Sequence, residues 1–343
     1  MRNEIAERVE RAIRERVFPG CVIGVVKKSV EREVLPFGHL TYDTNAPSVT
    51  ESTIYDLASI TKSIPTASLA LTLLEKGKFD LSDLVKKYIP ELQNDYGATI
   101  EHLLTYSVHG VQMSQLKDKT PEEISEYIFA RGFDGPPGES KYTNLPAFLL
   151  GLIVERVGGV YLEYLAQERL FGPLAMNSTT FFPQKYGHAV SIFPPTEVDG
   201  VGEEIRGIVH DESAYVFAKA GRAVGHAGLF STAPDILNFL EALLQKKYPA
   251  VVEGAQKGLG WQTAAPWFMG KSAGPRTFGK TGFTGTSVVC DMERGVAFVI
   301  LSNRTYPKRP ADAASIHSAV NVFRADVADI IFSAQGGSAS GRR

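Results

Sequence analysis

The chain has 343 residues, 44% of them hydrophobic and 22% charged, and its formal net charge at pH 7 is −2. Such a chain can bury a substantial core, either as one large domain or as two closely joined ones. The nearly balanced charge excludes a general electrostatic attraction to nucleic acid or to an anionic membrane surface, so we expect neither kind of partner. The sequence does not indicate an oligomeric state.

No stretch has the roughly 18 consecutive apolar residues of a membrane span, and residues 1–17 lack the apolar segment of a signal peptide. We therefore expect a cytoplasmic protein, although a removed signal sequence would leave no trace in the chain. Cys21 and Cys290 lie in apolar runs typical of strands, which favours two buried thiols over a disulfide. Residues 336–343 are rich in glycine and serine and predict a flexible tail.

The first part of the chain predicts alternating helices and strands. Hydrophobic periodicity indicates a helix, two strands and a second helix, at residues 4–17, 21–28, 33–40 and 59–76. Gly77 ends the second helix. Pro65 lies inside it and removes one backbone hydrogen bond, so we expect a kink or a wide turn there.

The middle of the chain changes to short helical pieces separated by Pro and Gly, at residues 100–105, 122–130, 145–157 and 161–170. The clearest start is Thr120-Pro121-Glu122-Glu123, with Thr as the N-cap and Pro at the first helical position. Residues 183–224 are rich in loop-forming residues and are predicted to wrap around the surface.

The last part predicts a helix, three strands and a closing helix, at residues 236–246, 278–281, 286–291, 296–302 and 311–333. Strands from both ends must join in one sheet, because two exposed strands alone are only marginally stable. We expect an α/β (α+β) fold, with an antiparallel sheet of five or more strands flanked by the N- and C-terminal helices. Residues 1–78 and 225–335 would form this sheet lobe, and residues 79–224 a helical, loop-rich lobe.

Ser59-Ile60-Thr61-Lys62 places a hydroxyl and an amine one helical turn apart. A serine nucleophile with a lysine that moves its proton has this S-x-x-K pattern. The pattern is weak alone, since a chain of this length contains about one match by chance, and Ser114-Gln115-Leu116-Lys117 is such a match. Ser59 stands where an extended segment becomes a helix, whereas Ser114 lies in a polar stretch. Taken alone, an N-cap role explains Ser59 better.

Tyr142-Thr143-Asn144 lies in a loop directly before a predicted helix. Alone, it is explained better as a loop tyrosine with a helix cap. In the functional interpretation, the phenol of Tyr142 reaches Ser59 and passes a proton to the leaving group. Asn144 would then hydrogen-bond Lys62 or the amide of a substrate.

Lys280-Thr281-Gly282 lies on a predicted strand. The Lys and Thr side chains can hold a carboxylate, and Gly282 lets a ligand approach the backbone. The amide of Phe283 could join the amide of Ser59 in an oxyanion hole. The order S-x-x-K, Y-x-N and K-T-G turns three weak signals into one strong indication of a serine hydrolase.

His210-Asp211-Glu212 and His226 suggest a metal site, but the chain contains neither H-E-x-x-H nor C-x-x-C. We instead expect His226, in the segment Gly225-His226-Ala227-Gly228, either to line the rim of the substrate cleft or to satisfy backbone groups. A Ser-His-Asp triad is disfavoured because the G-x-S-x-G elbow is absent from the sequence. We expect no metal and no cofactor.

With these motifs the chain resembles the serine β-lactamase and penicillin-binding-protein superfamily. It is most similar to the class C β-lactamase-like branch, which includes D-aminopeptidases and family VIII-type carboxylesterases. The resemblance spans nearly the whole chain, and it rests on residues 56–62, 102–105, 137–138, 142–144, 225–231 and 279–285.

The resemblance implies a site between a helix-flanked sheet and a helical lobe. It implies that Ser59 is the nucleophile and that Lys62 and Tyr142 are the acid/base pair. It also implies that the Asn144 amide positions the substrate and that Lys280 and Thr281 anchor it. The implied substrate is a small acyl compound: a β-lactam, a D-amino-acid peptide or an ester. Lys280 favours a substrate with a carboxylate near the scissile bond, whereas residues 106–110 depart from the family pattern beside the substrate.

Two other functions remain open. The first is a carboxylesterase or transacylase without significant β-lactamase activity. The second is a non-catalytic penicillin-binding sensor, although such a protein has no need to keep Ser59, Lys62 and Tyr142 together.

Overall fold

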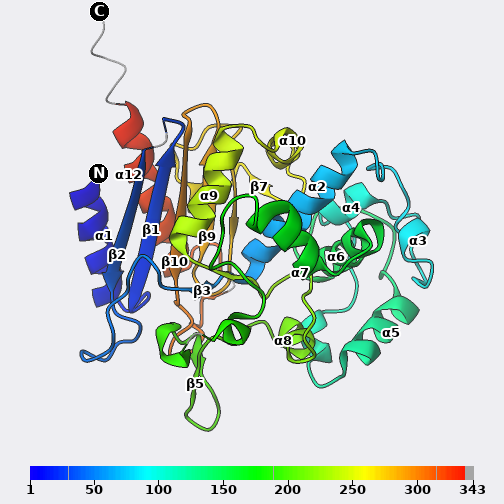
Figure 1. Cartoon of the computed structure of the whole chain (residues 1–343), viewed down its shortest axis with the longest axis horizontal. Helices are drawn as coiled ribbons and strands as arrows, with labels where there is room; N and C mark the ends of the chain where they lie inside the picture. Colours follow the sequence, from blue (N-terminus) through cyan, green and yellow to red (C-terminus); the bar gives the residue numbers. More distant parts are fainter. Residues whose placement is uncertain (30, 188, 314, 337–343) are drawn as a thin grey trace, which may run out of the picture.

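The protein contains a six-stranded antiparallel sheet with the strand order β2-β1-β10-β9-β8-β7 (Figure 1). The computed structural model describes residues 1–343 except 30, 188, 314 and 337–343, so the predicted flexible tail lies outside the described residues save for Gly336. The strands of the sheet are β1 Gly20–Lys27, β2 Arg32–Gly38, β7 Gln262–Thr263, β8 Phe278–Thr281, β9 Ser287–Asp291 and β10 Val296–Ser302.

The two ends of the chain complete this sheet, as the sequence predicts. β1 pairs with β10 in antiparallel register, with Cys21 opposite Ser302 and Lys27 opposite Val296. The predicted fold class, an antiparallel sheet with flanking helices and a helical part, is therefore confirmed. Cys21 and Cys290 are both buried free thiols.

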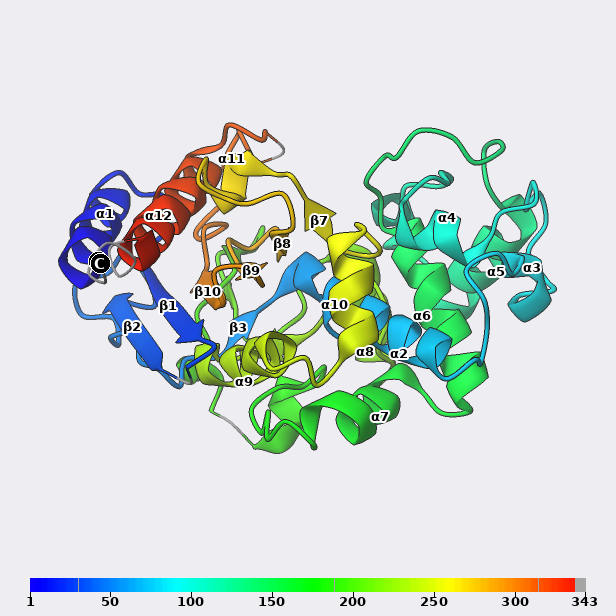
Figure 2. The ribbon, with the colours of Figure 1, turned by 90° about the horizontal axis from the view of Figure 1, so that it is seen from above.

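Both faces of the sheet are covered by helices, which gives three layers (Figure 2). Successive side chains of a strand point to opposite faces, so Ile23 of β1 joins one hydrophobic cluster and Val22 joins the other. Burial of each such side chain contributes roughly 1.5–3 kcal/mol. The covering helices are α1 Arg2–Arg14, α11 Pro266–Met269 and α12 Ala319–Gly336 on one face, and α9 Ala233–Leu244 on the other.

The remaining helices gather beside the sheet, on the right in Figure 1. They are α2 Ser68–Glu75, α3 Val85–Tyr88, α4 Ile100–Leu104, α5 Pro121–Arg131, α6 Leu145–Gly158, α7 Leu162–Ala166, α8 Glu212–Lys219 and α10 Pro249–Gln256. Short helical turns occur elsewhere in the chain, namely η3 Met113–Leu116, η4 Gln167–Phe171, η5 Pro183–Tyr186 and η6 Val190–Ile192. The predicted start of α5 is confirmed, because Thr120 and Glu123 exchange side-chain-to-backbone hydrogen bonds.

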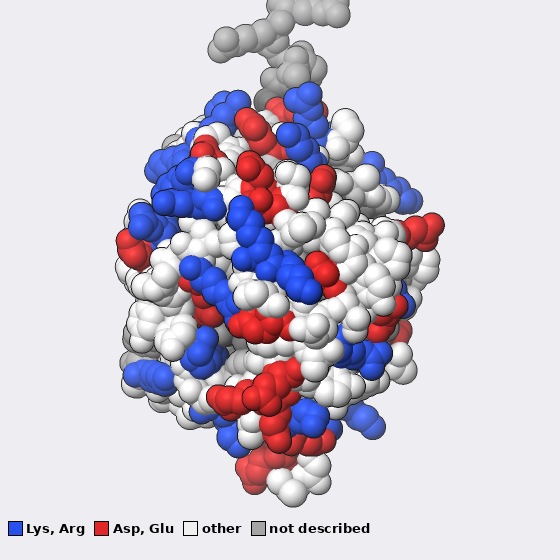
Figure 3. Space-filling model, turned by 90° about the vertical axis from the view of Figure 1, so that its right-hand side faces the viewer, with Lys and Arg blue, Asp and Glu red and all other residues white. Residues whose placement is uncertain are grey.

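No single helix among the described residues is long and apolar enough to cross a membrane. The segments Leu145–Gly158 and Leu162–Phe171 reach that length and composition only together, and they are bent by 74°. Acidic and basic side chains are interspersed on the face of the molecule that Figure 3 shows.

Three predicted elements differ from the structure. The helix expected at 59–76 is divided into the 3-10 turn η1 (Ala58–Lys62), the wide turn η2 (Ser63–Ala67) and α2. Ile64 leaves helical geometry with φ −120° and ψ 109°, directly before Pro65, so the expected kink is present. The stretch predicted as loop at 183–224 contains α8, and the closing helix begins at Ala319 rather than at 311.

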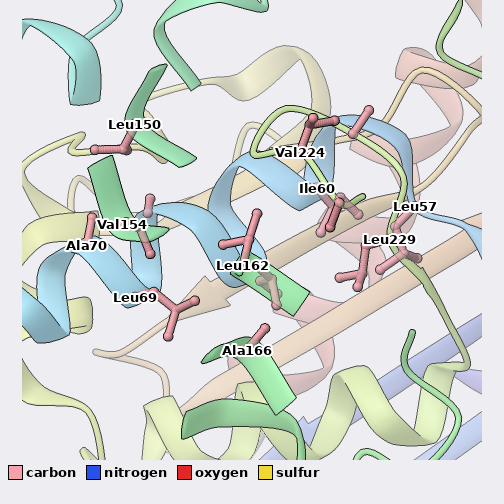
Figure 4. Packing of buried hydrophobic residues seen from close by; sticks show 14 of the residues in the cluster. Leu57, Ile60, Leu69, Ala70, Leu150, Val154, Leu162, Ala166, Val224 and Leu229 are labelled. Atoms are coloured by element: carbon pink, nitrogen blue, oxygen red, sulfur yellow. The ribbon is translucent and has the colours of Figure 1, made fainter. Parts of the chain in front are cut away.

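The segment that carries Ser59 and Lys62 is anchored in the larger hydrophobic cluster (Figure 4). Leu57 and Ile60 lie close to Leu229, which precedes the short strand β6 (Phe230–Ser231). β6 pairs with β3 (Tyr55–Asp56), and a second hairpin joins β4 (Glu197–Val198) to β5 (Glu204–Ile205). The start of the S-x-x-K turn is thus fixed by a strand pair and by buried apolar side chains.

Gly225 is where the loop before β6 passes closest to the helices. A Cβ atom at this position would lie 2.2 Å from the carbonyl oxygen of Ala147 and 3.0 Å from Cα of Gly151, both on α6. The backbone cannot yield without moving α6, so only glycine fits here.

Gly225→Ala should therefore lower the free energy of unfolding by about 1–3 kcal/mol, the usual cost of overpacking a close contact. Gly135→Ala is the matched control, because a Cβ there would meet no atom within 4 Å. Urea denaturation of both variants measures the difference. Equal stabilities for the two variants would contradict the close contact.

Candidate active site

Ser59 follows a residue with unusual backbone geometry. Ala58 has φ 47°, in the left-handed region that non-glycine residues rarely adopt. Two hydrogen bonds hold it there, from the amide of Ala58 to Asp56 Oδ1 at 2.7 Å and from Thr61 Oγ1 to the carbonyl of Ala58 at 2.7 Å. Such conformations cost about 1–3 kcal/mol and are found at functional sites. The sharp turn places Ser59 at the start of η1.

Lys62 lies against Ser59, as the S-x-x-K spacing predicts. Its Nζ donates to Ser59 Oγ at 2.9 Å and to the backbone carbonyl of His226 at 2.7 Å. Only 1% of the Lys62 surface is exposed. The amine is therefore held by the protein next to the serine hydroxyl, and it does not extend to solvent.

Tyr142 brings its phenol to the same place. The centre of its ring lies 5.2 Å from Nζ of Lys62 and 4.4 Å from Nζ of Lys280. Burial of the hydroxyl raises the pKa of Tyr142, but the two lysine charges and hydrogen bonds with Ser59 and Lys62 outweigh this effect. The pKa of Tyr142 therefore falls below its usual value, although 51% of the residue's surface is exposed.

Lys280 is the second buried amine, on β8, and it is also 1% exposed. Burial lowers the pKa of Lys280 from 10.5 to about 8, and the charge of Lys62 acts in the same direction. A group with this pKa is mostly charged at neutral pH and loses its charge in mildly alkaline solution. It can therefore attract an anion at pH 7.

The end of β8 is tied to the segment before Ser59. Thr284 Oγ1 donates to the carbonyl of Asp56 at 2.7 Å, and Thr286 Oγ1 donates to that of Leu57 at 3.0 Å. A Cβ atom on Gly282 would lie 2.3 Å from the same Leu57 oxygen, so the two backbones touch. The predicted oxyanion donors, the amides of Ser59 and Phe283, thus lie on neighbouring segments.

Two predicted site residues make other contacts than the sequence suggested, namely His226 and Asn144. The His226 ring is fully buried at 0% exposure, so the expectation that it lies at the rim of the cleft is wrong. Its backbone carbonyl, not its ring, reaches Lys62. The side chain of Asn144 donates to Asp211 Oδ2 at 3.0 Å, whereas the sequence suggested Lys62 or the substrate as its partner.

Tyr106 is a site residue that sequence reasoning did not identify. It is buried, with φ 57°, and its ring centre lies 5.3 Å from that of Tyr142 and 4.9 Å from Nζ of Lys280. The only signal was its position directly after Leu103-Leu104-Thr105, where the chain departs from the family pattern. Asp211, the partner of Asn144, was considered only as part of a metal site.

His210, Asp211 and Glu212 do not converge on one point. His210 Nε2 lies 3.0 Å from Glu197 Oε2, whereas Asp211 Oδ1 lies 3.3 Å from His226 Nε2. Within residues 1–336, leaving out the three undescribed positions, no group of three or more His, Cys, Asp or Glu side chains could hold a metal ion. Each of these residues instead takes part in a separate hydrogen-bonded contact.

Comparisons with known proteins agree with the fold and the motifs. The family model described as Beta-lactamase matches residues 5–321. A D-alanyl-D-alanine carboxypeptidase-like protein of Escherichia coli O157:H7 is 32% identical, with 75% of this chain and 70% of that protein covered.

Solved structures share the fold over nearly the whole chain. A β-lactamase/D-alanine carboxypeptidase from Pseudomonas syringae superposes with a TM-score of 0.73 at 19% identity, covering 94% of this chain and 98% of that one. A variant of simvastatin synthase from Aspergillus terreus superposes with a TM-score of 0.70 at 19% identity, covering 97% of each chain. At these identities the likeness concerns the fold alone.

Lys280→Met tests the buried charge through stability. The folded protein binds this proton with a pKa of about 8 and the unfolded chain with a pKa of 10.5. Below pH 8, Lys280 is charged in both the folded and the unfolded state, so the full cost of burying its charge is present. Between pH 8 and 10.5, Lys280 is charged only in the unfolded chain, so the wild type gains stability as pH rises. The difference between these pKa values corresponds to roughly 3 kcal/mol.

We therefore expect Lys280→Met to be more stable than the wild type at pH 7, by an amount that shrinks between pH 8 and 10.5. Urea denaturation at a series of pH values measures both proteins under the same conditions. A difference that stays constant over this range would contradict a lowered pKa for Lys280.

Proposed function

We propose that this chain, which belongs to the Beta-lactamase family, hydrolyses an acyl compound through a covalent intermediate on Ser59. Its family and relatives are serine hydrolases of the β-lactamase and penicillin-binding-protein type. The single observation that carries the assignment of the nucleophile is the 2.9 Å hydrogen bond from Lys62 Nζ to Ser59 Oγ, beside the phenol of Tyr142.

The arrangement supports a two-step reaction. The oxygen of Ser59 attacks the carbonyl carbon, and its proton passes to the Lys62–Tyr142 pair. The amides of Ser59 and Phe283 stabilise the negative oxygen of the tetrahedral intermediate. The carbon–nitrogen or carbon–oxygen bond then breaks, and the leaving group takes the proton. Water repeats the sequence on the acyl-enzyme and releases the acid.

The substrate we propose carries a carboxylate near the scissile bond, as D-alanyl peptides and β-lactams do. Lys280 supports this proposal, because a buried ammonium at the edge of β8 is a strong partner for an anion. Thr281, next to it, adds a hydroxyl donor. The related E. coli protein is named for D-alanyl-D-alanine, which ends in such a carboxylate.

A carboxylesterase or transacylase is the second candidate. The loop at residues 106–110 differs from the family pattern, and it carries Tyr106, which lies against Lys280. A change at this position can alter which acyl and leaving groups fit. Rates on matched peptide, β-lactam and ester substrates separate the candidates.

Ser59→Ala should abolish covalent labelling. We expect a fluorophosphonate and a penicillin each to add one adduct mass to the wild type in intact-protein mass spectrometry, and none to the variant. Ser114→Ala is the control, since it removes the other S-x-x-K serine and should label like the wild type. A label on the Ser59→Ala variant would assign the nucleophile elsewhere, and an adduct that never hydrolyses would favour a penicillin sensor.

The preference for a carboxylate should depend on pH. The measurement compares a peptide ending in D-alanyl-D-alanine with the same peptide ending in an amide. The kcat/KM value of the carboxylate peptide, divided by that of the amide peptide, should fall as pH rises through about 8. The reason is that Lys280 is charged below this pKa and neutral above it. In Lys280→Met the ratio should be small and independent of pH. A ratio that does not change in the wild type would contradict the role of Lys280.

A further inference from the structure

A polar network lies behind the catalytic residues, and the reaction described above does not use it. It consists of Asp211, Asn144, Ser213 and the ring of His226, and we refer to it as the Asp211 network. Asp211 Oδ1 accepts from Ser213 Oγ at 2.7 Å and from the amide of Ala214 at 2.9 Å. Asp211 Oδ2 accepts from Asn144 Nδ2 at 3.0 Å. Each oxygen of the carboxylate thus has a donor.

Asp211 carries a permanent negative charge. Its side chain is only 23% exposed. Burial raises the pKa of Asp211, but the His226 ring, the amide of Ala214 and the charge of Lys62 outweigh this effect and hold the pKa well below its usual value. An ionised carboxylate can only accept hydrogen bonds.

This restriction determines the orientation of the Asn144 amide. Its NH₂ group must face Asp211, because the carbonyl oxygen would meet a second acceptor there. The carbonyl oxygen then points away from Asp211. This oxygen is then the acceptor that Asn144 offers to an ammonium or a substrate N–H.

The same carboxylate determines the proton position on His226. Nε2 lies 3.0 Å from Ser213 Oγ and 3.3 Å from Asp211 Oδ1, whereas no described group hydrogen-bonds Nδ1. Burial lowers the pKa of His226, so the ring is neutral at pH 7 and its one proton lies on Nε2, facing the anion. The backbone carbonyl of the same residue accepts from Lys62, so His226 is held by its ring on one side and contacts Lys62 through its carbonyl on the other.

Helix capping alone does not account for this arrangement. Asp211 is the N-cap of α8, which explains the bonds from Ala214 and Ser213. It does not explain the bond to Asn144, 67 residues away in the chain, or the approach of His226. The neighbouring amide of His210 also donates to Asp56, whose other oxygen holds Ala58 before the nucleophile.

We propose that Asp211 is a positioning residue of the active site, which orients the Asn144 amide toward the substrate and holds His226 so that its carbonyl receives Lys62. The proposal rests on the acyl-enzyme function above. Labelling of wild-type Ser59 by a fluorophosphonate tests that function separately. The rates of the variants relative to the wild type test the role of Asp211.

The first test compares Asp211→Asn with Ser213→Ala. The Asn variant can still cap α8, but its NH₂ group faces that of Asn144, so one of the two amides must turn. Ser213→Ala removes one hydrogen bond to the same carboxylate and one contact of His226 Nε2. It leaves the charge of Asp211 and its contacts with Asn144 and His226 in place. We expect fluorophosphonate labelling of Asp211→Asn to be about 10–100-fold slower, and that of Ser213→Ala to stay within about threefold of the wild type.

The second test uses the pH profile of Asn144→Asp, which does not require Asp211 to change. Two facing carboxylates cannot both ionise easily, so the pair would hold a shared proton and one raised pKa. A protonated carboxyl group at position 144 donates to Asp211 as the amide did, so labelling should be faster at low pH and slower once the proton is lost. The other ionisable groups in this part of the site are common to all variants: Asp56, Lys62, Tyr106, Tyr142, His210, His226 and Lys280.

The double variant Asn144→Asp with Asp211→Asn supplies the matched control. Its new amide at position 211 donates to the new carboxylate at position 144 without a shared proton, so the additional ionisation should disappear from the labelling profile. Identical profiles for the single and double variants would overturn the proposal. The proposal would also be overturned if the folded Asp211→Asn variant reacted with the fluorophosphonate as fast as the wild type or as fast as Ser213→Ala.

Discussion

The active site depends on the burial of two ammonium groups close to the same tyrosine ring. Lys62 and Lys280 are each 1% exposed, and two buried like charges repel each other and lose hydration. The surrounding groups offset this cost: the Tyr142 ring lies close to both nitrogens, and the His226 carbonyl accepts from Lys62. Burial, with a contribution from the Lys62 charge, lowers the pKa of Lys280, and the two lysine charges lower the pKa of the Tyr142 phenol. The two positive charges are costly to bury together, and for the same reason they stabilise a negative charge beside them, on the phenolate or on a substrate.

The fold meets this constraint by bringing rigid segments together from distant parts of the chain. The S-x-x-K turn is anchored in the larger hydrophobic cluster, and β8 is a strand inside a six-stranded sheet. Hydrogen bonds from Thr284 and Thr286 join the two segments directly. Because each lysine is held by backbone elements that cannot shift independently, the amines cannot relieve their repulsion by moving toward solvent. This rigidity is what keeps a hydroxyl, a phenol and two amines at reacting distance.

The sequence predicts the elements whose causes are local. The Thr120 cap of α5, the kink before Pro65 and the alternating strands β9 and β10 follow from neighbouring residues, and each is present. Features determined by distant contacts were missed. One expectation placed the His226 ring at the cleft rim, but the ring is fully buried and contacts Asp211 and Ser213, which lie 15 and 13 residues away in the chain. α8 was hidden in a stretch rich in loop-forming residues, although Asp211 provides its cap. The order of the three motifs predicts the candidate site residues, but it gives no information on the groups behind them.

The surroundings of Lys280 are aromatic. The rings of Tyr106 and Tyr142 lie 4.9 and 4.4 Å from its nitrogen, and the charge of Lys62 also acts on it. Aromatic faces attract a cation without accepting a conventional hydrogen bond, so these two contacts leave the hydrogen-bonding capacity of the ammonium for an anion. Thr281, the next residue of β8, adds a hydroxyl beside it. Tyr106 keeps the left-handed backbone that this packing requires, at φ 57°, which few non-glycine residues tolerate. Tyr106 thus places the loop that departs from the family pattern directly against the buried amine of Lys280.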